Sequence, residues 1–348
     1  MNKSKLHSIL AAGALGDAVG YAVEFDSWAR IQQDWGPQGL TRWPLHPKTG
    51  TMAASDDTQM TLFAMEAISS VLRLRGPLAT EPELLDASRS AFLRWLQTQG
   101  GNGPLGPSGL LGRAEMFHRA APGNTCISAL TLIARGSAVA NQSKGCGAAM
   151  RAAPYAALAK DFGLDFVWRA ASAQGDLTHR HIDGHISGAA LAFIIGSEPK
   201  DMGELASRSL EAASRAELAG AVGTAHKLRQ AVDLSSCPMD PQTLCNVIGE
   251  GWVGDEAVGV ALWCALRSSS ASEAIFMAAN HRGDSDSTAS MAGQLAAGIH
   301  GMSTKELAGF SSVDLSFAMD EQCARLSLAL SVPAVPAGSG ATSGAPHS

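Results

Sequence analysis

Apolar residues recur along much of the chain at intervals of three and four positions, which is the spacing of one face of an α-helix. The clearest stretch is DDTQMTLFAMEAISSVLRLR at residues 56–75, and ELLDASRSAFLRWLQ at residues 83–97 is amphipathic in the same way. The spacing predicts a helix over each stretch with one face buried. The positions expected to face inward are Met60, Phe63, Ala64, Ala67 and Val71 in the first helix, and Leu84, Ala87, Ala91 and Leu96 in the second.

Three further stretches are apolar over most of their length. They are SGAALAFIIG, AVGVALWCALR and SEAIFMAAN, which we interpret as buried or half-buried helices. No stretch has a convincing hairpin or strand–helix–strand pattern. The sequence therefore predicts one all-α domain over residues 1–331, with long connections rich in Gly and Pro.

Two segments differ from the helical stretches in composition. GGNGPLGPSGLLG at residues 100–112 has the composition of a loop. The end of the chain, residues 332–348, has too few large apolar residues to fold and is predicted to be a disordered tail. Its GSGATSG stretch lacks the lysine of a phosphate-binding loop, so we do not interpret it as one.

The composition limits the classes of partner. Hydrophobic residues make up 46% of the 348 residues and charged residues 17%, which allows a sizeable core. The net charge is −6, and there is no basic stripe of the kind that follows nucleic-acid phosphates, so nucleic acid is not an expected partner. An anionic substrate would need local help from helix N-termini or a metal.

The sequence also favours a compartment. No apolar run reaches membrane-spanning length, and the run near the N-terminus is interrupted by Gly13, Gly16 and Asp17, unlike a secretory signal. The six cysteines are scattered and form no C-x-x-C pair, which is typical of free thiols in a reducing compartment. We expect a cytoplasmic protein with no membrane partner.

Two acidic pairs lie far apart in the sequence. Asp284 and Asp286 occur in NHRGDSDSTAS, and Asp56 and Asp57 follow Ser55 in ASDDTQM. Each pair precedes a helical stretch, so each has an ordinary interpretation as a helix N-cap. Taken together, however, the four carboxylates carry a formal charge of −4, which two divalent cations would neutralise. Hard oxygen ligands of this kind suit Mg²⁺, Mn²⁺ or Ca²⁺ better than zinc.

A third stretch, GALGDAVGYAVEF at residues 13–25, places three glycines on one side of a helical run. Such a stripe lets another backbone approach closely, or leaves room for a ligand. The stretch also contains Asp17 and Glu24, which have the alternative roles of a helix cap and a solvated residue. It is not a dinucleotide fingerprint, because no strand precedes it and the glycine spacing differs.

A fourth stretch, NQSKGCGAAMRAAPYA, contains Gly145 and Gly147. We expect the amides after these glycines to lead into a helix and to form an anion site suited to a diphosphate. In THRHIDGH, His181 and His185 share a helical face, as zinc ligands can, but no H-E-x-x-H motif or nearby cysteine accompanies them. We favour His179 as a neutral residue that contacts a ligand.

Seven ordered blocks resemble the ADP-ribosylglycohydrolases, including the dinitrogenase-reductase-activating glycohydrolases of bacteria. The blocks are GALGDAVGYAVEF, SDDTQMTL, APGNTCISAL, SKGCGAAMRAAP, THRHIDGHISGAAL, GEGWVGDEAVGVALWCAL and RGDSDSTASMAGQLAAGIHG, and they cover nearly the whole chain. The resemblance implies a compact orthogonal helical bundle with two Mg²⁺ ions in a central cleft, where Mn²⁺ is a possible substitute.

The resemblance also implies roles for particular residues. Two departures concern these residues: Ser55 and Ser287 stand where the family often has Thr, and the Gly loop has Cys146 and Ala148 where Asn or Ser is common. The implied metal ligands are Ser55, Asp56, Asp57, Asp284, Asp286 and Ser287; the implied substrate-binding residues are Glu24, Gly145, Gly147, Ala148 and His179; and the implied catalytic residues are Glu24, Asp56 and Asp284.

The function implied is Mg²⁺-dependent removal of ADP-ribose from modified proteins, most closely from ADP-ribosyl-arginine, by a protein that we expect to be monomeric. The general base stays open between Glu24 and a metal-bound carboxylate such as Asp284. Three alternatives remain: an immunity protein that neutralises an ADP-ribosyltransferase toxin, a non-catalytic ADP-ribose binder, and a hydrolase of another ADP-ribose conjugate.

Overall fold

The computed structural model describes residues 1–101 and 108–331. Within these residues the chain forms 16 α-helices and no sheet, and the only β-type pairings are two isolated bridges, Met52 with Val313 and Gly145 with Val253. The predicted all-α fold is therefore confirmed. The tail predicted over residues 332–348 lies outside the described residues.

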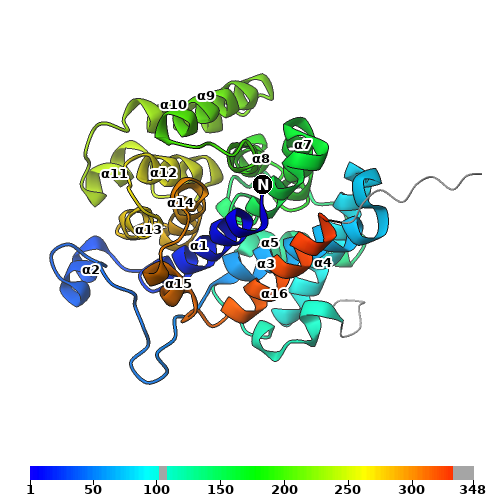
Figure 1. The fold of residues 1–348 in the computed structure, drawn as a ribbon, viewed down its shortest axis with the longest axis horizontal. Coiled ribbons are helices and arrows are strands. Elements are labelled where there is room, and N and C mark those ends of the chain that lie inside the picture. The colour runs from blue at the N-terminus through cyan, green and yellow to red at the C-terminus, as the bar shows by residue number, and fades with distance from the viewer. Residues whose placement is uncertain (102–107, 332–348) are drawn as a thin grey trace, which may run out of the picture.

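Figure 1 shows the order of the helices through the molecule. None of the helices in the described part is long and apolar enough to cross a membrane. Part of the loop predicted over residues 100–112 lies outside the described ranges, and its end forms a 3₁₀ turn. The helices are α1 Lys3–Tyr21, α2 Trp28–Trp35, α3 Asp56–Arg75, α4 Glu81–Thr98, α5 Asn124–Ala134, α6 Ala159–Phe162, α7 Leu164–Asp176, α8 Ile182–Gly196, α9 Met202–Leu218, α10 Val222–Asp233, α11 Pro241–Val247, α12 Gly254–Leu266, α13 Ala271–Ala279, α14 Ser285–His300, α15 Thr304–Phe310 and α16 Ser316–Ala329, with 3₁₀ turns η1 Gly76–Leu78, η2 Gly109–Gly112, η3 Ala114–Met116, η4 Cys146–Ala148 and η5 Ala153–Leu158.

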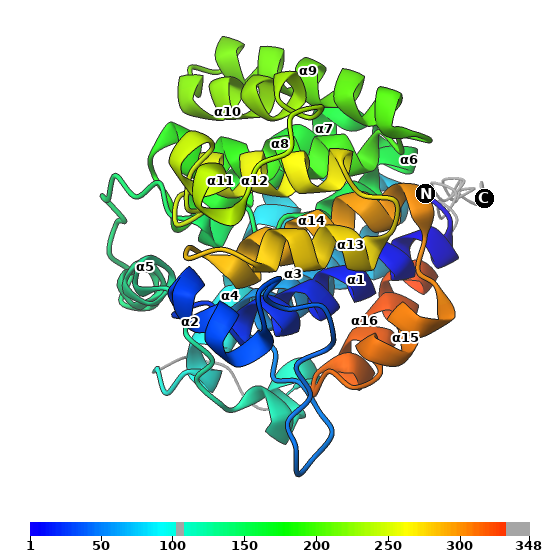
Figure 2. The same ribbon diagram turned by 90° about the vertical axis from the view of Figure 1, so that its left-hand side faces the viewer.

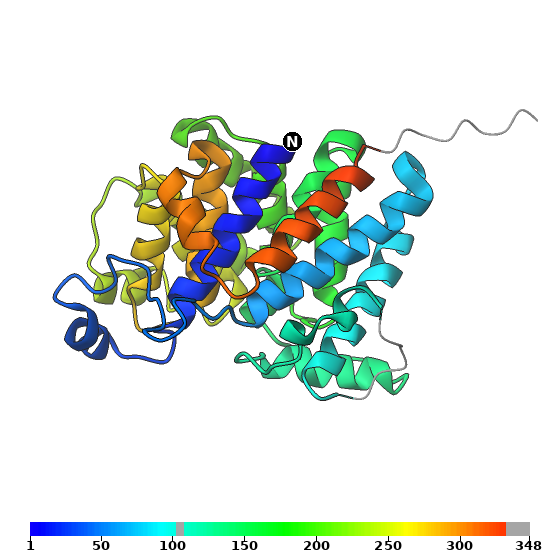
Figure 3. The same cartoon turned by 60° about the horizontal axis from the view of Figure 1, so that its bottom comes forward.

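The helices stack in layers around α14. In Figure 2, α9 and α10 form one outer layer, α8 and α12 lie beneath them, α13 and α14 come next, and α1 follows, with α15 and α16 on the opposite outer side. Figure 3 shows α16 between α1 and the pair formed by α3 and α4. Every residue of α14 from Ser285 to Ala297 is buried, so this helix is the central element of the fold.

The two helices predicted from periodicity begin and end with clear capping signals. Helix α3 spans the predicted residues 56–75, with Ser55 as its N-cap and Gly76 at its C-cap with a positive φ of 52°. Helix α4 starts with a capping box between Thr80 and Glu83. The predicted inward positions are buried except Ala87, which is half-buried. Local sequence therefore determined both helices.

The glycine stripe of α1 brings this helix against α14. A Cβ atom added to Gly16 would lie 2.2 Å from the carbonyl oxygen of Ala289, and one added to Gly20 would lie 2.1 Å from that of Ser285. No real Cβ approaches a backbone atom this closely. Of the two interpretations of the stripe, close backbone approach is the one that the structure shows at these glycines.

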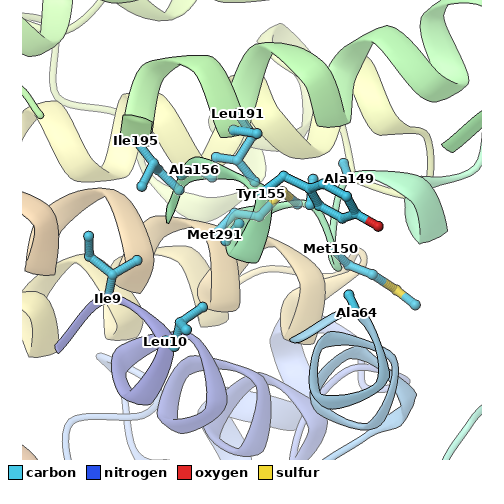
Figure 4. Close-up of a cluster of buried hydrophobic side chains, with 14 of the residues drawn as sticks. Ile9, Leu10, Ala64, Ala149, Met150, Tyr155, Ala156, Leu191, Ile195 and Met291 are labelled. Carbon is cyan, nitrogen blue, oxygen red and sulfur yellow. The ribbon is translucent and has the colours of Figure 1, made fainter. Parts of the chain in front are cut away.

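Behind this contact, side chains from distant segments form the apolar core. Figure 4 shows Leu10 of α1, Ala64 of α3, Leu191 of α8 and Met291 of α14 gathered around the η5 segment. Tyr155 of η5 is 1% exposed, and its hydroxyl is hydrogen-bonded to the Ser88 hydroxyl at 2.6 Å. The η5 segment thus packs against α3 and α8 in the interior of the molecule.

We predict that Gly16→Ala will lower the free energy of unfolding by about 1–3 kcal/mol or more, because the new methyl group overlaps the backbone of α14. Urea unfolding measures the change. The matched control is Gly112→Ala, where an added Cβ meets no atom within 4 Å. Equal stability of the two variants would contradict the close packing of α1 on α14.

Candidate functional site

The two acidic pairs, which are separated by more than two hundred residues, meet at one place in the fold. Asp56 and Asp57 occupy the first turn of α3, while Asp284 is the N-cap of α14 and Asp286 lies in its first turn. The Ser287 hydroxyl donates a hydrogen bond to Asp57 Oδ2 at 2.8 Å and so links the two pairs. Both ends are helix N-termini, whose partial positive charge favours carboxylates.

Glu24 completes the acidic cluster from a third direction, just after the end of α1. Glu24, Asp284 and Asp286 each offer a carboxylate oxygen, and these oxygens lie within 4.8 Å of one another. The Glu24 side chain is only 7% exposed, yet its Oε2 atom has no hydrogen-bond partner among the described residues. A buried acceptor oxygen without a protein partner is available to bind a metal ion or a hydrogen-bond donor of a ligand.

Asp17 supports the cluster from the middle of α1. Its carboxylate is fully buried and accepts hydrogen bonds from the backbone N–H groups of Ser55 and Thr58, each at 3.0 Å, and from the Thr58 hydroxyl. Asp17 therefore caps α3, although it belongs to a different helix. The sequence suggested a capping role but gave no sign of which helix Asp17 would cap.

The ionised forms of the carboxylates in this cluster are destabilised. Burial, followed by repulsion from Asp286, raises the pKa of Asp56, Asp57 and Asp284 well above the usual range. The same two causes raise the pKa of Asp17 to about 7 and that of Glu24 to about 9. Without a counter-ion, the cluster must therefore take up protons near neutral pH.

The residues present fit divalent cations as that counter-ion. The donors are hard oxygen atoms of carboxylates and a hydroxyl, and one of them, Glu24 Oε2, has no protein partner within the described ranges. Among the described residues that line the cavity beside the cluster there is no lysine, and the one arginine, Arg119, is exposed to solvent. A buried net negative charge of this size is stabilised by metal ions from solution.

The acidic cluster opens into a cavity of about 550 Å³. Its lining also includes Phe25 and Trp252, which are 73% and 41% exposed and therefore mark its mouth. Ser55 and Ala148 do not line it. The predicted site residues that do are Glu24, Asp56, Asp57, Gly145, Gly147, His179, Asp284, Asp286 and Ser287.

Ser55 and Ala148 are both completely buried. The Ser55 hydroxyl accepts the N–H of Asp57 at 3.1 Å, as an N-cap does. The Ala148 carbonyl accepts a hydrogen bond from Gln174 at 3.1 Å. The glycine loop leads into a helical segment as expected, and this segment is the single 3₁₀ turn η4.

The glycine loop packs tightly against His179. A Cβ atom on Gly145 would lie 3.2 Å from His179 Nε2, and one on Gly147 would lie 2.9 Å from Cε1 of the same ring. Lys144 anchors the loop by donating to Asp255 Oδ2 at 2.8 Å, and its carbonyl accepts the N–H of Gly254 at 2.7 Å. Asp255 is a supporting residue that the sequence reasoning missed, since only the fold brings it to the loop.

Cys146 joins the loop to the acidic cluster. Its thiol donates to Asp284 Oδ2 at 2.8 Å, and the Ser287 hydroxyl lies 3.5 Å from its sulfur. Burial and the charges of Asp284 and Asp57 raise the pKa of this thiol well above its usual value, so the thiol stays protonated and donates. The departure noted at this position in the sequence thus places a weak donor beside a predicted metal ligand.

The other two histidines of the THRHIDGH stretch bind the backbone separately. His181 is the N-cap of α8, and its Nδ1 accepts the N–H of Asp183 at 3.1 Å. His185 Nδ1 is 3.0 Å from the carbonyl oxygen of His179. Among the residues that the structure describes, the group with metal-binding geometry consists of three carboxylates, so nothing supports zinc at these histidines.

The described part of the chain thus combines an all-α fold with a buried carboxylate centre that could bind metal. The chain belongs to the ADP-ribosylglycohydrolase family, whose model matches residues 2–305. A solved structure described as an "ADP-ribosylglycohydrolase-related protein complex" is similar over 94% of this chain and 98% of its own, with a TM-score of 0.57 and 18% identity, and thus shares the fold. A comparison with curated proteins gave no significant match. Family membership makes the protein a glycohydrolase that acts on ADP-ribose conjugates.

We predict that the protein in chelator will become less stable as the pH rises. A pKa raised in the folded state means that the stabilising protons are fully bound below about pH 4, the ordinary value, and are lost as the pH passes about 7 at Asp17 and about 9 at Glu24. We expect the melting temperature in chelator to fall by about 5 °C or more between pH 5 and pH 9, measured by calorimetry.

Added Mg²⁺ should flatten this dependence, because cations replace the protons. Glu24→Gln is the matched variant and should show a smaller slope up to about pH 9, because it lacks the proton that Glu24 binds in the folded state. A melting temperature in chelator that is constant or rises over this range would contradict the assignment of the cluster as an uncompensated charge.

Proposed function

We propose that this protein is a Mg²⁺-dependent hydrolase that releases ADP-ribose from ADP-ribosylated arginine on proteins and so reverses mono-ADP-ribosylation. The observation that carries the proposal is the junction of two carboxylate pairs and Glu24 around one cavity, in a chain of the ADP-ribosylglycohydrolase family. The proposed partner is therefore an ADP-ribosylated protein, and the proposed assembly is a monomer.

Two divalent cations, Mg²⁺ or Mn²⁺, are the proposed cofactors. Four aspartates carry a formal charge of −4, which two such ions would neutralise. The Ser55 hydroxyl already accepts one hydrogen bond and keeps a second lone pair for a metal. When bound, these ions orient ribose hydroxyls and lower the pKa of an attacking water. The proposed ligands are Ser55, Asp56, Asp57, Asp284, Asp286 and Ser287.

The chain's own residues would position the substrate around this centre. Gly145 and Gly147 lack side chains where the cavity wall meets His179, which leaves the loop backbone and the His179 ring free to contact the diphosphate. Ala148 would contribute through the backbone of the same turn. The surrounding carboxylates favour the positive charge that develops on the ribose as the glycosidic bond breaks.

Glu24 is our candidate for the group that receives a proton from the attacking water. Asp284 Oδ2 accepts from the Cys146 thiol, and Asp56 Oδ2 accepts the N–H of Gly123 at 3.4 Å. Within the described residues, Glu24 Oε2 is the carboxylate oxygen of the cavity that is buried and without any partner. Geometry therefore favours Glu24 over Asp56 and Asp284 as the base, while those two would act as metal ligands.

We propose the arginine linkage because the residues that line the cavity are negatively charged. Five carboxylates line it, and two divalent cations would neutralise four of them, which leaves the charge of Glu24 to attract a cationic guanidinium leaving group. The sequence likeness to arginine-directed bacterial members supports the same choice. The six cysteines, all in the described part, are unbridged, which agrees with the proposed cytoplasmic location.

We predict that release of ADP-ribose from ADP-ribosyl-arginine will require Mg²⁺ or Mn²⁺ and will stop in chelator. Asp56→Asn and Asp286→Asn should each reduce turnover at least about 100-fold, because each removes one anionic metal ligand. Both variants should keep their helical content, measured by circular dichroism, since each removes a repelling charge from the cluster. Full turnover in chelator would contradict a role for metal ions in the reaction.

The same assay, run on arginine-, serine- and DNA-linked ADP-ribose, tests the linkage. Faster release from arginine than from serine is the expected order. The reverse order would overturn the arginine assignment and leave the hydrolase intact. Wild-type protein that binds ADP-ribose but releases it from no linkage would instead identify a non-catalytic binder.

We predict that Glu24→Gln will lower turnover by about 10²–10⁴-fold, the usual effect of losing one positioned acid–base group. ADP-ribose affinity, measured by calorimetry, should change much less, because the metal ions and the glycine loop hold most of the ligand. Turnover near the wild-type value would show that Glu24 does not handle a proton. A parallel loss of affinity and turnover would assign it to binding alone.

A further inference from the structure

Arg151 is a buried arginine whose partners are not carboxylates. Its side chain is completely buried, and within the described ranges no carboxylate oxygen lies inside ion-pair distance of it. The guanidinium stacks over the Phe92 ring at 4.3 Å and donates from Nε to Gln174 Oε1 at 2.8 Å. Burial of an arginine is costly in free energy unless its N–H groups are hydrogen-bonded. The partners of the remaining N–H groups therefore show what this arginine does.

One of those donors determines the role of the neighbouring threonine. Arg151 Nη2 donates to the Thr178 hydroxyl oxygen at 2.8 Å. An arginine has no acceptor, so the oxygen of Thr178 must be the acceptor in this contact. The single hydrogen of the Thr178 hydroxyl is then free for another partner. His179 Nδ1 lies 2.9 Å away, whereas the Gly175 carbonyl lies 3.4 Å away, so the hydrogen goes to the histidine.

This arrangement fixes the tautomer of His179. A ring nitrogen that accepts from Thr178 has no hydrogen, so the hydrogen of the neutral imidazole is on Nε2. Burial lowers the pKa of His179 to about 3, which keeps the ring neutral. His179 lines the cavity, and its Nε2 lies against Gly145 and Gly147 with no hydrogen-bond partner among the described residues.

We infer that Arg151, acting through Thr178, sets His179 as an Nε2–H donor that binds a phosphate oxygen of ADP-ribose beside the glycine loop. Phosphate oxygens only accept hydrogen bonds, so the opposite tautomer would present a lone pair to the diphosphate and repel it. Arg151 and Thr178 are positioning residues and His179 is the contact. The substrate half of the inference depends on the proposed function, while the tautomer does not.

The test is the tautomer itself in the full-length protein labelled with ¹⁵N-histidine. Long-range ¹H–¹⁵N spectra distinguish a nitrogen that carries hydrogen from one that does not. For wild-type His179 we expect hydrogen on Nε2 and none on Nδ1, with the His179 signals assigned by their loss in His179→Gln. Hydrogen on Nδ1 in the wild-type protein would overturn the inference, whatever the enzyme's activity.

Substitution of the relay residue extends the test to the ligand. Thr178→Val keeps the shape but removes the hydroxyl, so we expect mixed His179 tautomers and ADP-ribose binding weakened about 10-fold in the presence of Mg²⁺. Thr178→Ser retains the hydroxyl and should restore both values. Thr98→Val is the matched control, since it also removes a buried hydroxyl bond, to the Trp95 carbonyl, away from the cavity.

The outcomes separate the two proposals. An unchanged tautomer or unchanged ADP-ribose affinity in Thr178→Val would contradict the relay, even if the enzyme turns over as proposed. Wild-type protein that fails to bind ADP-ribose would refute both the proposed function and the phosphate contact. If Thr178→Val unfolds, the spectrum of Thr178→Ser and of wild type still decides the tautomer.

Discussion

Burial of six carboxylates at the meeting point of α1, α3 and α14 is the constraint on which the rest of the structure depends. In an apolar interior such charges repel one another and lose their hydration, and both effects raise the pKa of Asp17 and of Glu24. Backbone N–H groups at the starts of α3 and α14 offset part of it. The remainder is offset by bound protons or, as we propose, by divalent cations, so the residues whose burial is costly are also the proposed metal ligands.

Contacts with the surrounding helices hold these carboxylates in their buried positions. The glycine stripe lets α1 approach α14 closely enough for Asp17 to reach the start of α3. On the other side, the N–H of Asp284 donates to the Glu250 carbonyl at 2.8 Å, and buried His281 is hydrogen-bonded to the Thr288 hydroxyl at 2.9 Å. These contacts hold both acidic pairs in defined positions, which is the preorganisation that electrostatic catalysis requires.

Much of the fold and part of the site could be predicted from sequence because their signals are local. The periodicity of apolar residues predicted both ends of α3 correctly. The position of an acidic pair at the start of each of two helices suggested that the pairs share one centre. The contacts of Asp17 with Thr58, and of Cys146 with Asp284, join residues far apart in the chain, and no local pattern encodes them. The helix expected after the glycine loop is the short 3₁₀ turn η4, and its length is not encoded by the glycines that precede it.

The central claim is that the two acidic pairs share two divalent cations. Anomalous diffraction from crystals of the protein grown with Mn²⁺ tests it most directly, because manganese is located independently of the protein chain. The account predicts two peaks in the cavity, bound between the carboxylates of residues 56–57 and those of residues 284–286. No peak there, or a single peak held by one acidic pair alone, would contradict it.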